Sequence, residues 1–272
     1  MQKVESSRLK VGEDDVHLWF AAPEDLENDE LLTQYRQLLS PAEIRRLEAF
    51  RFEKDQLNFL VAHALVRIVL SRYSSQPAAE LEFVPNHWGR PEVAYPPHIQ
   101  LKFSLSRSKN LVLCGVTATR EIGVDVEHTE WRSPLDVADR FFAPTEISEL
   151  RKLPAESQRS RFFDYWTLKE SYIKARGMGL SIPLDKFSFD LRRESHIRLA
   201  VDPELGGEGD DWGFLLLQAG RHHRVAVAVR RRPGGQIRWR AWKSAPLKVD
   251  RPLLPSVRAR TPDFSATPSS ST

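Results

Sequence analysis

The chain has 272 residues, 41% of them hydrophobic and 10% aromatic, and a net charge of +3. This composition supports a sizeable core in one large domain or two compact halves and excludes a disordered chain. Residues 221–272 contain twelve Lys or Arg against two Asp, so the remainder is mildly acidic and overall charge gives no argument for nucleic-acid binding.

Targeting signals and disulfides are not expected. The N-terminus lacks the apolar core of a signal peptide, and the most apolar run, 57–70, is interrupted by His63 and Arg67. The one cysteine, Cys114, rules out an internal disulfide and lies in a run typical of a buried strand. We therefore expect a chain without a membrane span in the reducing cytoplasm.

The first half of the chain is predicted to contain an opening strand, three helices and four strands. Ser40, Pro41 and Glu43 supply an N-cap, a first-turn proline and a capping-box acid for the second helix. Apolar residues recur at helical spacing in the third. The predicted ranges are 14–22 for the strand, 30–39, 44–50 and 56–73 for the helices, and 80–84, 92–95, 101–105 and 111–117 for the later strands.

A strand with two carboxylates follows. Ile122, Val124 and Val126 alternate with smaller or acidic residues. This period of two places Asp125 and Glu127 on one face of the strand. Neighbouring carboxylates repel each other unless a cation lies between them, and hard oxygen ligands of this kind suit Mg²⁺ or Mn²⁺.

The second half centres on a helix over 162–176 that Gly177 would end. Glu170 and Lys174 are one turn apart and share a face of this helix. They could form an ordinary exposed ion pair, or Glu170 could add a third carboxylate to the site. Helices are also predicted over 134–142 and 144–153, and strands over 187–191, 197–201, 213–218 and 225–229.

A long helix followed by four strands thus occurs twice. We predict an α+β fold of two similar halves, 1–118 and 119–232, related by a pseudo-twofold axis with the active site in the cleft between them. Residues 233–272 are rich in Pro, Gly, Arg and Ser and are predicted to form a basic, flexible tail.

Two motifs in this order resemble the signature pair of the 4′-phosphopantetheinyl transferases. They are Gly123-Val124-Asp125-Val126-Glu127 and Trp166-x-x-Lys169-Glu170-Ser171-x-x-Lys174-Ala175-x-Gly177-x-Gly179-Leu180. The resemblance covers about residues 40–231. The chain length is similar to that of the larger, pseudo-symmetric, monomeric type, which serves polyketide, nonribosomal peptide and fatty-acid synthases.

The resemblance implies transfer of 4′-phosphopantetheine from coenzyme A to a serine of an acyl or peptidyl carrier protein, with release of 3′,5′-ADP. It implies no nucleic-acid or membrane partner. Asp125, Glu127 and Glu170 would hold Mg²⁺, or Mn²⁺, at the pyrophosphate of coenzyme A. Glu170, directly or through a metal-bound water, would accept the serine proton, and Lys174 would stabilise the leaving phosphate or donate a proton to it.

Coenzyme A carries a 3′-phosphate and a pyrophosphate, so its binding also requires cationic side chains. The resemblance suggests Arg46, Arg51, Arg90, Arg107 and Lys169 for this role. Arg90 occupies the lysine position of the family's Gly-Lys-Pro turn, and Arg107 stands where the family has histidine. An arginine can still bind phosphate bidentately, although each arginine could instead be a solvated surface charge.

Three other functions remain as alternatives. A Mg²⁺-dependent nuclease or phosphodiesterase often has lysine two residues after an acid, where this chain has Thr129. A scaffold that binds coenzyme A or a carrier without transfer would not need the carboxylates and Lys174 together. Nucleic-acid binding by the basic segment 221–260 lacks a zinc, helix-turn-helix or aromatic-interleaved motif.

Overall fold

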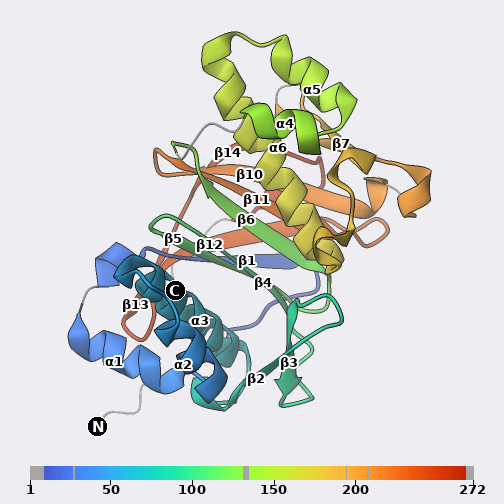
Figure 1. Cartoon of the computed structure of the whole chain (residues 1–272). Coiled ribbons are helices and arrows are strands. Elements are labelled where there is room, and N and C mark those ends of the chain that lie inside the picture. Colours follow the sequence, from blue (N-terminus) through green and yellow to red (C-terminus); the bar gives the residue numbers. More distant parts are fainter. Residues whose placement is uncertain (1–8, 27, 131–134, 194, 207–208, 268–272) are drawn as a thin grey trace.

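The computed structural model describes residues 9–26, 28–130, 135–193, 195–206 and 209–267. Two β-sheets pack face to face, and helices cover the outer face of each sheet (Figure 1). The α+β class is therefore confirmed. In the described part of the chain, no helix combines the length and apolar character that crossing a bilayer requires.

The elements follow the predicted order. The first half contains β1 (Asp15–Ala21), α1 (Asp29–Leu38), α2 (Pro41–Glu48), α3 (Glu53–Tyr73), β2 (Glu82–Pro85), β3 (Pro91–Tyr95), β4 (Lys102–Ser108) and β5 (Leu111–Thr117). The second half contains β6 (Ile122–His128), α4 (Leu135–Phe141), α5 (Pro144–Arg151), α6 (Ala155–Arg176), β7 (Phe187–Asp190), β8 (Ser195–His196), β9 (Arg198–Val201), β10 (Trp212–Ala219) and β11 (His223–Arg230). Residue 134, in the predicted helix 134–142, lies outside the described residues.

The two halves use the same strand connections. In the first sheet β1 pairs antiparallel with β5, and β4 and β5 form a hairpin. In the second sheet β6 pairs antiparallel with β11, and β10 and β11 form a hairpin. Strands from the end of the chain complete both sheets: β12 (Ile237–Ala245), β13 (Val249–Pro252), β14 (Ser256–Arg260) and β15 (Phe264–Ala266). The sheet orders are β13-β12-β1-β5-β4, with β15 also on β12, and β6-β11-β10-β14-β8. β4 and β6 are thus edge strands of different sheets.

Three apolar clusters hold these layers together. The first packs α3 against the outer face of the first sheet, for example through Leu65 and Val112. The second packs α6 on the outer face of the second sheet, where Tyr172 meets Phe214. The third lies between the sheets and includes Val124 of β6. Burial of these faces stabilises the stack by about 25 cal/mol per Å² of apolar surface.

The prediction of a flexible tail is wrong for residues 237–266. This segment forms β12 (Ile237–Ala245), β13 (Val249–Pro252), β14 (Ser256–Arg260) and β15 (Phe264–Ala266). β12 runs parallel to β1 inside the first sheet, whereas β14 joins β10 in the second. Trp242 of β12 also stacks on Trp19 of β1, with ring centroids 4.5 Å apart. The boundaries 1–118 and 119–232 therefore do not enclose complete halves.

The capping box that begins α2 is confirmed and is part of a larger ionic cluster. Glu43 accepts hydrogen bonds from the Ser40 amide at 2.7 Å and from the Arg67 guanidinium at 2.6 Å, and its other oxygen lies 2.7 Å from His63 Nδ1. Burial alone would raise the pKa of Glu43, but these hydrogen bonds and the Arg67 charge outweigh it and lower the pKa to about 2.

Glu43→Gln should therefore destabilise the protein in a pH-dependent way. In the unfolded chain Glu43 has its ordinary pKa of about 4.5. At pH values above this, the ionised carboxylate stabilises the folded state by roughly 2–3 kcal/mol. This contribution is lost as the pH falls from about 5 towards 2. Urea unfolding of both proteins at several pH values should show the stability gap closing over this range. A gap that stays constant would contradict this account of Glu43.

Candidate functional site

The motif strand β6 lies directly under α6, and Gly123 makes this close approach possible. A Cβ atom built at Gly123 would lie 1.9 Å from the Ser171 carbonyl oxygen and 2.3 Å from the Ala175 amide nitrogen of α6. Side chains on the facing surfaces of β6 and α6 are therefore brought within hydrogen-bonding range. The motif therefore has glycine at position 123 because any larger residue there would overlap the backbone of α6.

Gly123→Ala should force α6 away from β6. The new methyl group would clash with helix backbone, which cannot rotate out of the way, so we expect a loss of about 1–3 kcal/mol in the free energy of unfolding. Gly235→Ala serves as the control, because no atom lies closer than 3.3 Å to a Cβ built there. Chemical denaturation measures both, and an unchanged stability for Gly123→Ala would disprove the tight β6–α6 contact.

Asp125, Lys174 and Ser106 form a hydrogen-bonded triangle in which Asp125 and Ser106 are buried and Lys174 is partly exposed. Lys174 Nζ donates to Asp125 Oδ1 at 2.6 Å and to Ser106 Oγ at 3.0 Å, and Ser106 Oγ donates to the same Asp125 oxygen at 2.9 Å. Asp125 is 3% exposed, and its second oxygen, Oδ2, has no hydrogen-bond partner among the described residues. A buried carboxylate oxygen without a partner is costly and indicates a place for a ligand.

Glu127 and Glu170 complete an acidic group around Asp125. Burial and the Asp125 charge raise the pKa of Glu127 to about 7, although Lys174 and a 3.3 Å hydrogen bond from Trp166 Nε1 oppose this rise. Burial and Asp125 also raise the pKa of Glu170. The predicted carboxylates therefore lie close enough to act on one another, and the structure brings them together.

The carboxylates are not arranged as a finished metal cage. Within the described residues, no group of three His, Cys, Asp or Glu side chains is placed to hold a metal ion. Lys174 instead supplies the positive charge next to Asp125. Asp125 Oδ2 is buried without a partner, and two neighbouring carboxyls have raised pKa values, so a divalent cation bound to these oxygens would offset their charge and the residues fit Mg²⁺ or Mn²⁺ by their chemistry.

Two of the predicted phosphate-binding arginines lie together, and one of them, Arg107, directly follows the site residue Ser106 in the chain. The guanidinium groups of Arg46 and Arg107 lie over the Phe59 ring, 5.6 and 5.7 Å from its centroid, and Arg107 is also 5.4 Å from the Phe50 centroid. Arg107 follows Ser106 on β4, which continues to Ser108, so Arg107 is on a strand that extends beyond the predicted range 101–105. Both arginines are exposed and available to an anion.

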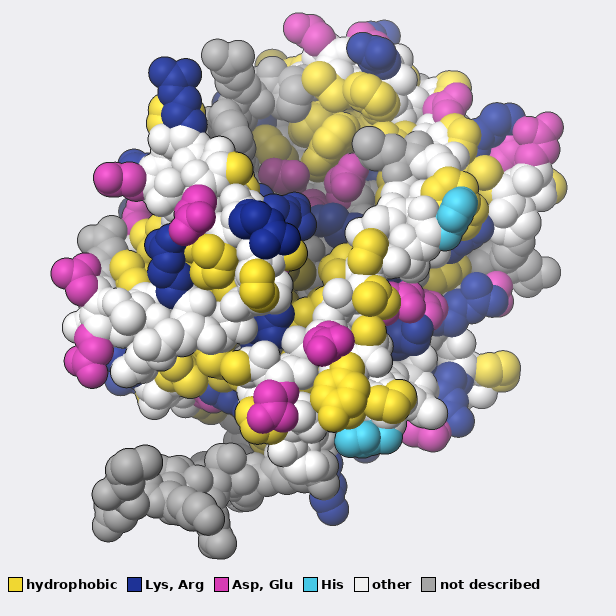
Figure 2. All heavy atoms as spheres, turned by 60° about the horizontal axis from the view of Figure 1, so that its bottom comes forward, with side chains coloured by type: hydrophobic (Ala, Val, Ile, Leu, Met, Phe, Trp, Pro, Cys, Tyr) yellow, Lys and Arg dark blue, Asp and Glu magenta, His cyan; other side chains and the backbone are white. Residues whose placement is uncertain are grey.

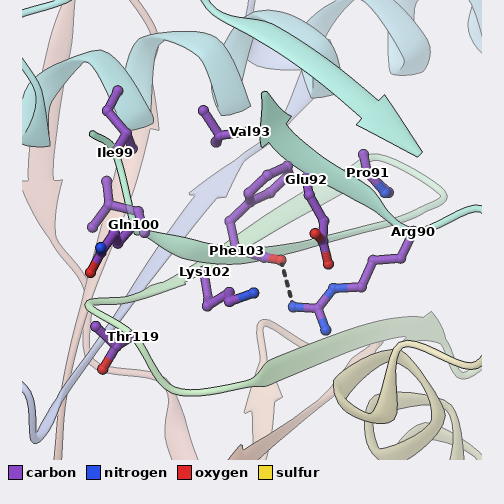
Figure 3. Close-up of a pocket in the computed structure, with 10 residues that line it drawn as sticks. Arg90, Pro91, Glu92, Val93, Ile99, Gln100, Lys102, Phe103 and Thr119 are labelled. Atoms are coloured by element: carbon purple, nitrogen blue, oxygen red, sulfur yellow. Dashed lines mark hydrogen bonds between the residues drawn. The ribbon is translucent and has the colours of Figure 1, made fainter. Parts of the chain in front are cut away.

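The other predicted cofactor contacts have different surroundings. Arg51 lies over the ring of its exposed neighbour Phe52. Arg90 pairs with Glu121 at 2.5 Å and donates to the Ala175 and Phe103 carbonyls, so it links the first half to the end of α6. Arg90 also lines a pocket of about 310 Å³. Figure 3 shows Arg90 with the other residues that line this pocket. A phosphate contact by Arg90 would have to compete with Glu121.

The prediction that Lys169 binds coenzyme A is wrong. Its side chain is fully buried in the second half, on a different face of α6 from Glu170. Lys169 Nζ contacts Glu146 Oε2 at 2.7 Å and the carbonyl oxygens of Leu184 and Phe187 at 2.7 and 2.6 Å. Lys169 therefore fixes α6 to α5 and to the following loop, since a buried ammonium needs such partners.

Sequence reasoning assigned no role to Ser106, although this residue contacts two of the site residues. The alternation of serines in 103–108 was a signal for a strand with one polar face, but it did not show what that face meets. Figure 2 shows a hollow in the upper part of the molecule in which acidic, basic and hydrophobic side chains meet.

Comparison with known proteins gives a consistent result. Residues 121–229 match the family model described as the 4′-phosphopantetheinyl transferase superfamily. The chain is 33% identical to the 4′-phosphopantetheinyl transferase HetI of Nostoc sp. over 79% of this chain and 88% of that protein. It is 32% identical to the 4′-phosphopantetheinyl transferase Sfp of Bacillus subtilis over 62% and 73% of the two chains. A phosphopantetheinyl transferase of Thraustochytrium sp. is 31% identical over 70% of each chain.

Proposed function

The chain belongs to the 4′-phosphopantetheinyl transferase superfamily, and we propose on this basis that it transfers 4′-phosphopantetheine from coenzyme A to a serine of acyl or peptidyl carrier proteins. The product pair is the holo carrier and 3′,5′-ADP. The observation that supports this chemistry most directly is the hydrogen-bonded group of Asp125, Ser106 and Lys174 beside Glu127 and Glu170.

In the proposed reaction the serine oxygen of the carrier attacks the phosphorus that bears the pantetheine arm. A new bond forms between this oxygen and phosphorus, and the bond from phosphorus to the bridging oxygen breaks, so 3′,5′-ADP leaves with that oxygen. Glu170, one of the two carboxylates with a raised pKa, accepts the serine proton, directly or through a water. Lys174 stabilises the charge that develops on the departing phosphate.

We assign the cation site to Asp125, Glu127 and Glu170, with Mg²⁺ as the ion and Mn²⁺ as a substitute. A bound divalent cation would neutralise pyrophosphate charge. Asp125 offers the unpartnered Oδ2 for this purpose, while its Oδ1 stays with Ser106 and Lys174. Trp166 Nε1 donates a hydrogen bond to Glu127 Oε1 at 3.3 Å and so helps to hold this carboxylate in place.

Arg46 and Arg107 are proposed to bind the 3′-phosphate of coenzyme A, with Arg51 and Arg90 as further contacts. The support is that two exposed guanidinium groups lie together over the Phe59 ring, one of them on the residue that follows Ser106. Arginine at 107 would bind a phosphate bidentately and without a change of charge near neutral pH.

We further propose that the chain acts as a monomer in the cytoplasm and serves polyketide, nonribosomal peptide or fatty-acid synthases. Support for a monomer comes from the strands β4 and β6 and the helix α6, which supply the site residues from a single chain. The free, buried Cys114 is consistent with a reducing compartment.

Chromatographic measurement of 3′,5′-ADP release tests the proposal against two of the three alternatives, the phosphodiesterase and the scaffold. With coenzyme A and Mg²⁺, the transferase should release 3′,5′-ADP only when an apo carrier is present. Release without carrier would indicate a hydrolase of the phosphodiesterase type. Binding of coenzyme A without release, for several unrelated carriers, would indicate a scaffold.

A further inference from the structure

The edges of the two sheets are joined by serine side chains instead of backbone pairing. The amides of Val124, Val126 and His128 on β6 donate to the hydroxyl oxygens of Ser104, Ser106 and Ser108 on β4. The three distances are 3.1, 3.2 and 3.0 Å. These amides are alternate groups of an edge strand, and they need acceptors because β11 pairs with the other edge of β6. We call Ser104, Ser106 and Ser108 the serine ladder.

The middle serine of the ladder has a second set of contacts. Ser106 Oγ accepts from Lys174 Nζ at 3.0 Å and donates to Asp125 Oδ1 at 2.9 Å, in addition to accepting from the Val126 amide. A hydroxyl has one donor and two acceptor positions, so all three positions of Ser106 are used. Ser106 is 6% exposed, and solvent therefore has little access to replace any of these partners.

We infer that Ser106 is a positioning residue that sets the orientation of the Asp125 carboxylate and the Lys174 ammonium relative to each other. This inference rests on the proposed function. With Ser106 and Lys174 both on Oδ1, the carboxylate is held with Oδ2 free for a cation. The hydrogen bond that Ser106 Oγ accepts from the Val126 amide fixes the hydroxyl itself to β6.

The other two serines provide matched controls. Ser104 and Ser108 each accept one β6 amide at nearly the same distance as Ser106 does, and neither contacts Asp125 or Lys174. Alanine at 104, 106 or 108 thus removes one comparable bond between the sheets, whereas only Ser106→Ala also removes the contacts within the site.

Steady-state kinetics of the full chain with coenzyme A, Mg²⁺ and an apo carrier test the inference, beside thermal unfolding of each variant. Groups that orient a metal-binding residue typically contribute about 10–100-fold to activity or metal affinity. Ser106→Ala should therefore lower kcat and raise the half-saturating Mg²⁺ concentration by about this factor, with KM for coenzyme A little changed. Ser104→Ala and Ser108→Ala should lower the melting temperature similarly but keep kcat.

Three outcomes are distinct. A kcat loss confined to Ser106→Ala supports the positioning role. Equal kcat losses in all three variants, or no loss in Ser106→Ala, overturn the positioning role. The proposed function still stands in that case, because the wild-type chain transfers the group. An inactive wild-type chain overturns the proposed function and the inference together.

Discussion

Asp125→Asn should reduce carrier modification by about 10³-fold or more while leaving the protein folded. The substitution keeps the size of the side chain but removes the charge that Lys174 contacts at 2.6 Å and that a divalent cation would need at Oδ2. Electrostatic stabilisation of developing charge in a water-excluded site is worth several kcal/mol, which corresponds to a loss of this order. The measurement is the initial rate of holo-carrier formation at saturating coenzyme A.

Asp25→Asn is the matched control for this prediction. Asp25 also forms a carboxylate–lysine ion pair, with Lys243 at 2.6 Å, but both side chains are more than half exposed. Such a surface pair contributes little, so rate and stability should remain near those of the parent chain. If Asp125→Asn transferred at a rate close to that of Asp25→Asn, Asp125 would not be part of the reacting site.

A chain that ends at Arg232 should fail to fold. It would lack β12, which lies between β1 and β13 in the first sheet, and β14, which pairs with β10 in the second. Ile237, Trp239 and Phe264 would leave the core between the sheets, where each is at most 3% exposed. Losing several such side chains, at about 1.5–3 kcal/mol each, removes most of a typical stability of about 5–15 kcal/mol.

Circular dichroism during heating measures this effect. The full chain should show one cooperative transition, and the chain ending at Arg232 should show none. A chain ending at Thr267 keeps every strand that the structure describes, so its transition should match that of the full chain. A cooperative transition for the shorter chain at the same temperature would mean that β12 and β14 contribute nothing to the sheets.

Local patterns were sufficient to place the main site elements. Period-two alternation through Val124 predicted β6 with Asp125 and Glu127 on one face, and helical spacing predicted that Glu170 and Lys174 share a face of α6. The close contact of β6 with α6 also agrees with the glycine of the motif. These predictions hold because each depends on residues within one element.

Long-range contacts account for the errors. The resemblance suggested Lys169 as a coenzyme A contact, but successive helical residues point about 100° apart, so Lys169 does not share the face of Glu170, and its partner, Glu146, is on α5. Similarly, the Pro, Gly and Arg content of 233–272 concealed the alternation of buried Ile237 and Trp239 with exposed Arg238. That alternation was a strand signal that composition alone outweighed.

The role of Ser106 could not be predicted from local sequence. Its strand, β4, pairs with β5 along the backbone, and no pattern in 103–108 indicates that the free edge meets a strand from the other half. Only the packing of the two sheets shows that Ser106 reaches Asp125 and Lys174.

Intact-mass spectrometry of an apo carrier protein, incubated with the chain, coenzyme A and Mg²⁺, tests the central claim most directly. A parallel incubation with the Glu170→Gln variant is the control. This substitution keeps the shape of the side chain but removes the carboxylate proposed as metal ligand and proton acceptor. The account predicts that the carrier gains one phosphopantetheine group with the parent chain and none with Glu170→Gln. A carrier mass that stays unchanged across several unrelated apo carriers, or an equal gain with both chains, would contradict it.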